Sequence, residues 1–322
     1  MPHSASSPTE KSARKYPLGV DLQGNGRELF LKNPVLTASG TFGYGLEFAP
    51  FGELSALGGI IVKGLSLLPR EGNAMPRIAE TPCGMLNAIG LQNCGVQTFL
   101  KDKLPRLQKY GVPVIANLYG TSTGEFAELA RILSAEQGIA ALEVNISCPN
   151  VKEGGVAFGQ NPKMAREVTK AVMGASGSMP VIVKLSPNVT DIVPVAKACE
   201  EGGATCLSLI NTLRGMAVDI ARRKPFLSTV IGGLSGPAIK PVALRCVWEV
   251  ANAVSIPVIG VGGILTAEDL LEFILVGAHA VQIGTGNLLK PDTAFTVVAD
   301  LPRAMARHGI DSLAEFRHSL EV

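Results

Sequence analysis

The sequence lacks the features that mark many membrane and metal-binding proteins. It contains no run of 18 consecutive apolar residues, so no segment is expected to cross a bilayer as a helix. Its six cysteines include no CxxC pair and no spacing typical of a metal site. We therefore expect no metal centre and no iron–sulfur cluster in this chain, and reduced thiols in a cytoplasmic protein.

Net charge and histidine are also scarce. Lys and Arg total 29 and Asp and Glu total 27, which gives a net charge of +2. That excess lies in the first 17 residues, so the remainder is neutral and offers no electrostatic patch for nucleic acid or an anionic membrane. The four histidines, at positions 3, 279, 308 and 318, lie at no predicted strand end, so hydrolysis by a histidine-assisted nucleophile is not expected.

What the chain does have is enough apolar sequence for one large domain. It is 322 residues long, 47% hydrophobic and 17% charged, which suffices for a sizeable core. Residues 1–17 are polar and rich in Ser and Pro, and they lack the apolar stretch of a signal peptide. We predict a disordered tail over 1–17 and a single domain over 18–322.

Short β-branched runs alternate with helical patterns along this domain, after a β-hairpin over residues 18–32 that turns at Asn25-Gly26. Thr266 and Asp191 are the expected N-caps of two of the helices. The predicted strands are 34–38, 59–63, 112–118, 141–146, 181–185, 206–211, 257–261 and 280–284. The predicted helices are 47–57, 96–109, 124–136, 162–173, 192–201, 237–254, 267–276 and 291–306.

Eight strand–helix units without a break in composition predict an α/β protein with a (β/α)8 TIM barrel. The alternative is a doubly wound open sheet, which more often has a GxGxxG turn after its first strand; residues 38–45 do not match that pattern. Two connections, 64–95 and 212–236, are too long for simple loops. Both follow strands at the face where barrel active sites form, so both are expected to cover the site.

Polar residues gather at the carboxyl ends of the predicted strands, which converge on one mouth of a barrel. The most informative stretch is Asn-Ile-Ser-Cys-Pro-Asn (145–150). Pro149 ends the strand, so Cys148 lies on the following loop. A free cysteine is often only a small buried hydrophobe, but a thiol at this position can also transfer a proton, and carboxamides can bind a flat polar heterocycle.

The same strand ends predict a site for an anion. Glycine pairs follow the last two strands, and loops at these barrel positions commonly bind phosphate through backbone N–H groups. Lys63 and Lys184 end two apolar strands, where a lone lysine often only reaches for solvent. With three nearby asparagines and no carboxylate at the strand ends, the pair indicates a phosphate, a carboxylate or a reduced flavin as ligand.

These residues carry a resemblance that covers nearly the whole chain from residue 18 onward. The chain resembles the catalytic subunit of dihydroorotate dehydrogenase, an FMN enzyme of pyrimidine biosynthesis. The matching motifs are Asn-Ile-Ser-Cys-Pro-Asn (145–150), Asn-Ala-Ile-Gly-Leu-Gln-Asn (87–93), Val-Lys-Leu-Ser-Pro (183–187), Asn-Thr-Leu-Arg-Gly-Met (211–216) and Gly-Leu-Ser-Gly-Pro-Ala (233–238).

The resemblance is closest to the soluble class 1 enzymes, which have cysteine where the membrane-associated class has serine. Residues 81–87 and 232–244 resemble the NAD-linked type, class 1B, although Cys83 stands where a small residue is expected. That type implies a partner subunit that holds FAD and a 2Fe-2S cluster, in a heterotetramer with two copies of each chain.

The resemblance also implies a role for each matching residue. Cys148 would be the base that takes a proton from C(5) of dihydroorotate while C(6) gives hydride to FMN, and Lys184 would stabilise the anionic reduced flavin. The implied substrate-binding residues are Lys63, Asn87, Ala88, Ile89, Gly90, Leu91, Asn145, Asn150, Asn211 and Thr212. The implied FMN-binding residues are Ser39, Lys63, Gly64, Asn117, Asn145, Lys184, Ile210, Gly236, Gly262, Gly263, Gly284 and Thr285.

Several alternatives stay open at this point. The flavin domain of dihydropyrimidine dehydrogenase shares the Ser-Cys-Pro stretch, but histidine is expected there in place of Asn150. A fumarate-linked dihydroorotate dehydrogenase differs from the NAD-linked type in its electron acceptor. A flavin-free isomerase or aldolase acting on a phosphorylated sugar could use the same barrel, and so could a non-catalytic scaffold, since fold alone does not decide function.

Overall fold

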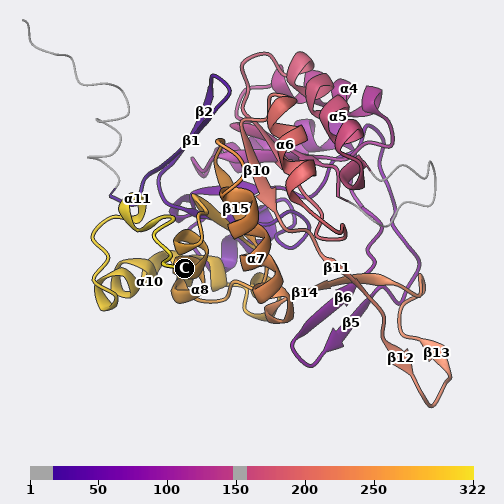
Figure 1. Cartoon of the computed structure of the whole chain (residues 1–322). Coiled ribbons are helices and arrows are strands. Elements are labelled where there is room, and N and C mark those ends of the chain that lie inside the picture. Colours follow the sequence, from indigo (N-terminus) through magenta and orange to yellow (C-terminus); the bar gives the residue numbers. More distant parts are fainter. Residues whose placement is uncertain (1–16, 148–157) are drawn as a thin grey trace, which may run out of the picture.

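The computed structural model describes residues 17–147 and 158–322 of the chain (Figure 1). The tail predicted over 1–17 lies outside these residues except for Pro17, and Cys148 and Asn150 lie outside them as well.

Eight parallel strands close into a barrel, which confirms the predicted TIM-barrel fold and rules out the open sheet. The last strand pairs with the first, so the sheet has no edge. Nearly every strand residue is buried, because helices cover the outside and side chains fill the inside. In chain order the strands are β3 (Val35–Thr37), β4 (Gly59–Ile61), β7 (Val114–Leu118), β8 (Ala141–Asn145), β9 (Val181–Lys184), β10 (Cys206–Leu209), β15 (Val258–Val261) and β16 (Ala280–Ile283).

Five of the eight predicted helices form as single helices, whereas those predicted over 47–57, 96–109 and 237–254 are divided, the last of them into a 3-10 turn, η5 (Pro237–Ile239), and an α-helix, α7 (Lys240–Ala251). The first is two 3-10 turns, η1 (Leu46–Phe51) and η2 (Leu54–Ala56), with Pro50 inside η1, where it removes a backbone donor. The second comprises α2 (Val96–Thr98), a π-helical turn η3 (Phe99–Lys103) and α3 (Leu104–Gln108) with a proline in its first turn. The remaining helices are α4 (Thr123–Ser134), η4 (Phe158–Gln160), α5 (Pro162–Ala175), α6 (Val193–Glu201), α8 (Ala267–Leu275), α9 (Gly286–Leu289), α10 (Thr293–Arg307) and α11 (Leu313–Phe316).

One of the two predicted N-caps is confirmed and the other is displaced. The hydroxyl of Thr266 accepts from the Asp269 backbone N–H, and the Asp269 carboxylate accepts from the Thr266 backbone N–H. These two bonds form a capping box at the start of α8. The prediction for Asp191 is wrong by one position, because Ile192 is the N-cap of α6. The Asp191 carboxylate still accepts from the Val193 N–H at 3.0 Å, so it satisfies a free donor of the first turn.

The predicted hairpin closes the amino-terminal end of the barrel. Strands β1 (Val20–Gly24) and β2 (Arg27–Leu31) turn at Asn25 and Gly26, both with positive φ, as a two-residue hairpin turn requires. Leu22 and Leu31 are fully buried against apolar side chains from the barrel strands. The hairpin therefore leaves only the opposite, carboxyl-terminal mouth available for a site.

The two long connections meet in a four-stranded antiparallel sheet, here called the insertion sheet. Its order is β11 (Leu213–Gly215), β14 (Gly232–Ser235), β6 (Gly84–Asn87) and β5 (Ile78–Thr81). A second hairpin, β12 (Val218–Asp219) and β13 (Lys224–Pro225), extends from it (Figure 1). Two insertions that are far apart in sequence are thus joined by backbone pairing, with Gly233 opposite Asn87.

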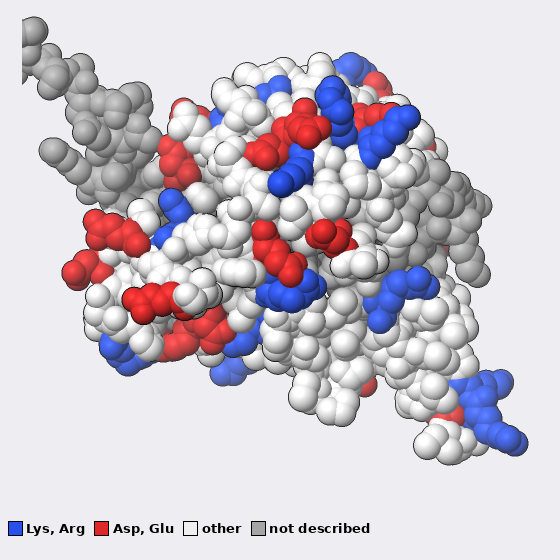
Figure 2. Space-filling view, viewed as in Figure 1, with Lys and Arg blue, Asp and Glu red and all other residues white. Residues whose placement is uncertain are grey.

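Charged side chains of both signs are interspersed over the barrel face in Figure 2, and basic side chains gather at the tip of the β12–β13 hairpin. In the part of the chain that the structure describes, no helix combines the length and the apolar character that crossing a bilayer requires.

His279 makes the stability of the barrel sensitive to acid. Its backbone N–H donates to the Val258 carbonyl at 2.7 Å, and its ring Nδ1 accepts from the Val258 backbone N–H at 3.4 Å. Burial lowers the pKa of His279 to about 3, and the positive charge of Arg317 acts in the same direction. The unfolded chain, with a histidine pKa near 6.5, therefore binds this proton first as the pH falls.

Between pH 6.5 and 3, we expect His279 to lower the free energy of unfolding by about 1.4 kcal/mol for each unit that the pH falls. Above about pH 6.5, His279 should make the free energy of unfolding no more dependent on pH. Urea denaturation of His279→Gln at several pH values should show a correspondingly shallower acid slope. His308→Gln, at an exposed position, is the control. An unchanged slope in His279→Gln would assign the acid sensitivity to other groups.

Candidate active site

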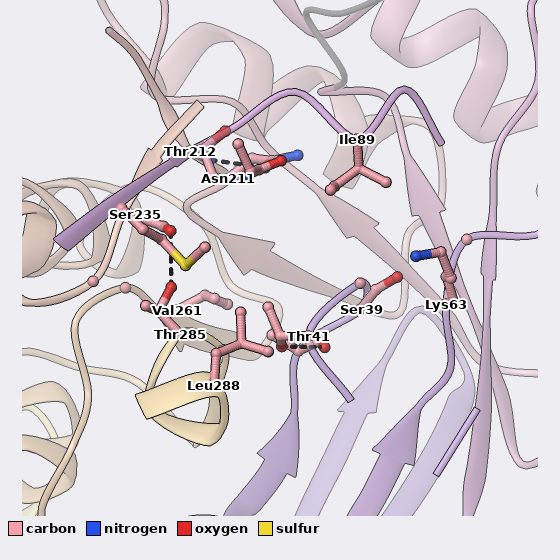
Figure 3. Close-up of a pocket in the computed structure, with 18 of the residues that line it drawn as sticks. Ser39, Thr41, Lys63, Ile89, Asn211, Thr212, Ser235, Val261, Thr285 and Leu288 are labelled. Atoms are coloured by element: carbon pink, nitrogen blue, oxygen red, sulfur yellow. Dashed lines mark hydrogen bonds between the residues drawn. The ribbon is translucent and has the colours of Figure 1, made fainter. Parts of the chain in front are cut away.

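A cavity of about 320 Å³ lies at the carboxyl-terminal mouth of the barrel, beneath the insertion sheet. Figure 3 shows Ser39 and Lys63 on one side of it and Asn211 and Thr212 on another. Strand ends and the insertion sheet both supply its lining. The lining includes these residues predicted from the sequence: Ser39, Lys63, Gly64, Asn87, Ile89, Gly90, Leu91, Asn117, Asn145, Lys184, Ile210, Asn211, Thr212, Gly236, Gly262, Gly263, Gly284 and Thr285.

Three predicted residues are not among this lining. Cys148 and Asn150 lie outside the described part of the chain. Ala88 is fully buried and packs with Leu86 and Leu227 in the small core of the insertion sheet. Its backbone joins the surrounding loop, because its carbonyl accepts from the side chain of Asn73 at 2.9 Å.

The segment 87–91, predicted from the sequence to bind substrate, contains a strained backbone position. Leu91 has a φ of 59°, a left-handed conformation that costs a non-glycine residue energy. The Asn93 amide, which is buried, donates to the Leu91 carbonyl at 2.8 Å and keeps the turn in place. Such strain persists only where the surroundings impose it, so this loop has a fixed shape at the cavity wall.

Lys63 places a cation at the cavity. It follows β4, and its backbone N–H donates to the Gly43 carbonyl at 2.9 Å. Burial lowers the pKa of Lys63, and the charge of Arg77 lowers it further, whereas Glu47 acts in the opposite direction. An ammonium in this partly desolvated position is suited to bind a carboxylate or phosphate.

A chain of hydrogen bonds orients the asparagines on the opposite wall. Asn211 donates to the Ser147 hydroxyl at 2.7 Å, and that hydroxyl donates to Oδ1 of Asn145 at 3.0 Å. Oδ1 of Asn211 accepts from the Thr212 N–H at 2.7 Å. Since its oxygen is engaged, Asn145 offers its Nδ2 donors, for which the described residues supply no partner.

The glycine loops after β15 and β16 leave room for an anion. Gly262 and Gly263 have φ values of 137° and 73°, and a Cβ on Gly263 would lie 2.7 Å from Cβ of Lys240. The N–H groups of Gly263, Gly284 and Thr285 donate to no acceptor within residues 17–147 and 158–322. The Thr285 hydroxyl donates to Ser235 at 2.8 Å and ties this loop to the insertion sheet (Figure 3). This is the arrangement expected of a phosphate-binding cradle.

Glu143 is one of the residues of this region that the sequence analysis missed. The expectation of no carboxylate at the strand ends overlooked it because it lies two residues before Asn145. It is fully buried, accepts from Asn117 Nδ2 at 2.7 Å, and lies 3.9 Å from Nζ of Lys184. The two-residue spacing from Asn145 was the available signal, since alternate residues of a strand face the same side. Arg77 and Ser235, which also line the cavity, had no such signal because only the insertion sheet brings them there.

Comparison with known proteins agrees with the geometry. A sequence model described as dihydroorotate dehydrogenase matches residues 22–305. A protein of Solidesulfovibrio magneticus is 70% identical over 292 residues, which cover 91% of this chain and 95% of that protein. One of Maridesulfovibrio salexigens is 66% identical over 95% of this chain and 99% of its own length. One of Geobacter sulfurreducens is 55% identical over 96% of this chain and all of its own length.

Each of these three proteins is named dihydroorotate dehydrogenase B (NAD(+)), catalytic subunit. Both the matched length and the identities far exceed what a shared barrel alone would give. The chain therefore belongs to the dihydroorotate dehydrogenase family, and within it to the group of the NAD-linked, class 1B catalytic subunits.

Proposed function

We propose that this chain oxidises (S)-dihydroorotate to orotate in pyrimidine biosynthesis, with FMN as its cofactor and NAD as the final electron acceptor. The observation that carries the proposal is a single cavity at the barrel mouth lined by Lys63, Asn145 and Lys184, in a member of this family. The cations suit the carboxylate of an anionic pyrimidine, and the carboxamides suit the polar edges of its planar ring.

The cavity fits FMN at both of its ends. The glycine loops would hold the phosphate through their free N–H groups, and Oδ1 of Asn117, buried without a partner among the described residues, would accept from the ring system. When bound, FMN supplies a hydride acceptor. The proposed contacts are Ser39, Lys63, Gly64, Asn117, Asn145, Lys184, Ile210, Gly236, Gly262, Gly263, Gly284 and Thr285.

The chain's own residues would bind the substrate and remove its proton. The Lys63 ammonium would pair with the carboxylate, and the amides of Asn145 and Asn211 would fix the ring edges. Cys148, which lies outside the described residues, would take the C(5) proton as hydride leaves C(6). The further proposed substrate contacts are Asn87, Ala88, Ile89, Gly90, Leu91, Asn150 and Thr212, of which Ala88 would act through its backbone loop.

Electrons would leave through a second protein. The relatives' names pair NAD with a catalytic subunit, which implies another subunit to complete the enzyme. We infer that this partner holds FAD and a 2Fe-2S cluster and forms a heterotetramer with two copies of each chain. We also infer a cytoplasmic location, since the five described cysteines are free thiols, and a single folded domain over 18–322.

The half-reaction tests the proposal directly. The purified chain is reconstituted with FMN and mixed anaerobically with L-dihydroorotate while the visible absorbance of the flavin is followed. Prompt bleaching is expected, and addition of NAD with the partner should restore the absorbance. A flavin that binds but stays oxidised, together with no affinity for orotate, would favour a uracil-reducing relative; a chain that takes up no FMN would overturn the proposal. Reoxidation by fumarate alone would instead identify the fumarate-linked type.

Gly284 offers a test of the phosphate cradle that spares the fold. A Cβ at this position would lie 3.4 Å from Cβ of Ala38 and 3.7 Å from Oγ1 of Thr41, which are ordinary contacts. Both neighbours line the cavity, so the new methyl group would occupy cavity space. We expect Gly284→Ala to melt within a few degrees of the wild type yet to bind FMN at least tenfold more weakly in a fluorescence titration.

Gly174→Ala is the matched control, because this glycine lies in α5 with open space where the Cβ would be. It should bind FMN as the wild type does. Equal FMN affinity in Gly284→Ala would place the phosphate elsewhere.

A further inference from the structure

A buried carboxylate lies beneath the cavity and has no role in the chemistry described so far. Glu143, on β8, has no exposed surface. It accepts from Asn117 Nδ2 at 2.7 Å, from the Ser208 hydroxyl at 2.9 Å and from Gln282 Nε2 at 2.5 Å. Nζ of Lys184 lies 3.9 Å from it. Its partners thus come from β7, β9, β10 and β16, across the barrel interior.

Burying a carboxylate in a barrel core has a high cost in free energy. Removing a carboxylate from water costs several kcal/mol, and replacing a buried ion pair by apolar residues is often neutral or stabilising. Stability alone therefore gives a poor account of Glu143. All four of its partners are buried, and two of them, Asn117 and Lys184, also line the cavity. The carboxylate is positioned to act on the cavity through these two side chains.

The first action is on the amide of Asn117. An ionised carboxylate only accepts hydrogen bonds, so it requires Asn117 to direct its NH2 group inward. The carbonyl oxygen is then turned toward Gly64, where a Cβ would lie 3.0 Å from it. That oxygen is buried without a partner among the described residues. Glu143 thereby makes this part of the cavity floor a hydrogen-bond acceptor.

The second action is on the electric field in the cavity. The Lys184 side chain is 7% exposed, so water screens its charge poorly. The carboxylate 3.9 Å away offsets much of the positive potential that this ammonium would otherwise produce. A ligand in the cavity therefore interacts with the opposite charges of Lys184 and Glu143 together, and not with the Lys184 cation alone.

We propose that Glu143 is a positioning residue that sets the potential of the bound flavin, by orienting Asn117 and by offsetting the charge of Lys184. The inference rests on the proposed function, because it requires FMN in this cavity. A negative charge next to this cavity would disfavour the electron-rich reduced form of a flavin bound there, relative to the oxidised form. Glu143 thus holds the midpoint potential lower than Lys184 alone would.

The test is the two-electron midpoint potential of FMN bound to a set of variants, measured by equilibration with reference dyes. Glu143→Gln removes the charge, so the reduced flavin should gain at least tenfold in relative affinity, equivalent to about 30 mV more positive. Lys184→Met should move the potential in the opposite direction. The double variant Glu143→Gln/Lys184→Met has neither charge, so the net charge of the pair is again zero and the potential should return close to that of the wild type.

The double variant also protects the test against misfolding, because it leaves no buried charge unpaired. Asp21→Asn, which neutralises a carboxylate on β1 at the other end of the barrel, should leave the potential unchanged. If Lys184→Met and the double variant have equal potentials, Glu143 contributes nothing to the field and the inference is wrong. Failure of the wild type to bind FMN would instead overturn the proposed function, so the two failures are distinguishable.

Discussion

Replacement of Cys148 by alanine is expected to lower the rate of flavin reduction by dihydroorotate at least a hundredfold while leaving FMN and orotate bound. A positioned general base contributes roughly 10²- to 10⁴-fold to a proton transfer, and alanine keeps the small apolar volume of the side chain without its proton acceptor. Anaerobic stopped-flow absorbance measures the reduction, and titration with orotate measures the affinity.

The pH dependence of the same reaction should identify the thiol. An ordinary cysteine, with a pKa near 8.5, is mostly protonated at neutral pH. The active base is the thiolate, so the reduction rate of the wild type should rise with pH until the thiol is ionised. In Cys148→Ala the residual rate should lack this rise. Cys83→Ala, which removes an exposed thiol, should behave as the wild type does. Near-normal reduction in Cys148→Ala would eliminate this residue as the base.

Replacement of Lys63 by methionine should weaken orotate binding by about ten- to a hundredfold. A hydrogen bond to a charged group contributes about 1.5–3 kcal/mol, and the cavity is partly desolvated around this ammonium, as the lowered pKa of Lys63 indicates. Isothermal titration of the FMN-loaded chain gives the dissociation constant. Methionine keeps most of the side-chain volume, so the effect reports the charge.

The affinity for orotate should also depend on pH through Lys63. Because burial and Arg77 lower the pKa of Lys63, its ammonium loses the proton at a lower pH than an ordinary lysine does. Orotate affinity should therefore decline as pH rises toward the usual lysine range, and Lys63→Met should not show that decline. Lys101→Met, at an exposed position of η3, is the control. Equal affinities for wild type and Lys63→Met would remove Lys63 from the carboxylate site.

The barrel could be predicted from the sequence because its signals are local. Buried strands such as Val181–Lys184 are short β-branched runs, and each is followed by a segment with helical periodicity. The ends of those strands predict Lys63, Asn117 and Asn145 at one mouth, and the structure brings them to one cavity.

What could not be predicted depends on contacts between distant segments. Strands β6 and β14 contain glycines, which disfavour strands, and they form only by pairing across the two insertions. The insertion sheet was therefore expected only as long covering loops. The helix predicted over 47–57 is the reverse case, because Pro50 is a local signal against a continuous helix there.

The insertion sheet has a consequence for how the protein is made. Asn87 and Gly233 are 146 residues apart, and their strands complete the wall above the cavity. Most of the chain must therefore have left the ribosome before that wall can form, even if the earlier barrel strands have already folded. Contacts of such long separation are slow to form, because the loop between them must close first. During synthesis, the ligand-binding end of this protein is thus among its last parts to be completed.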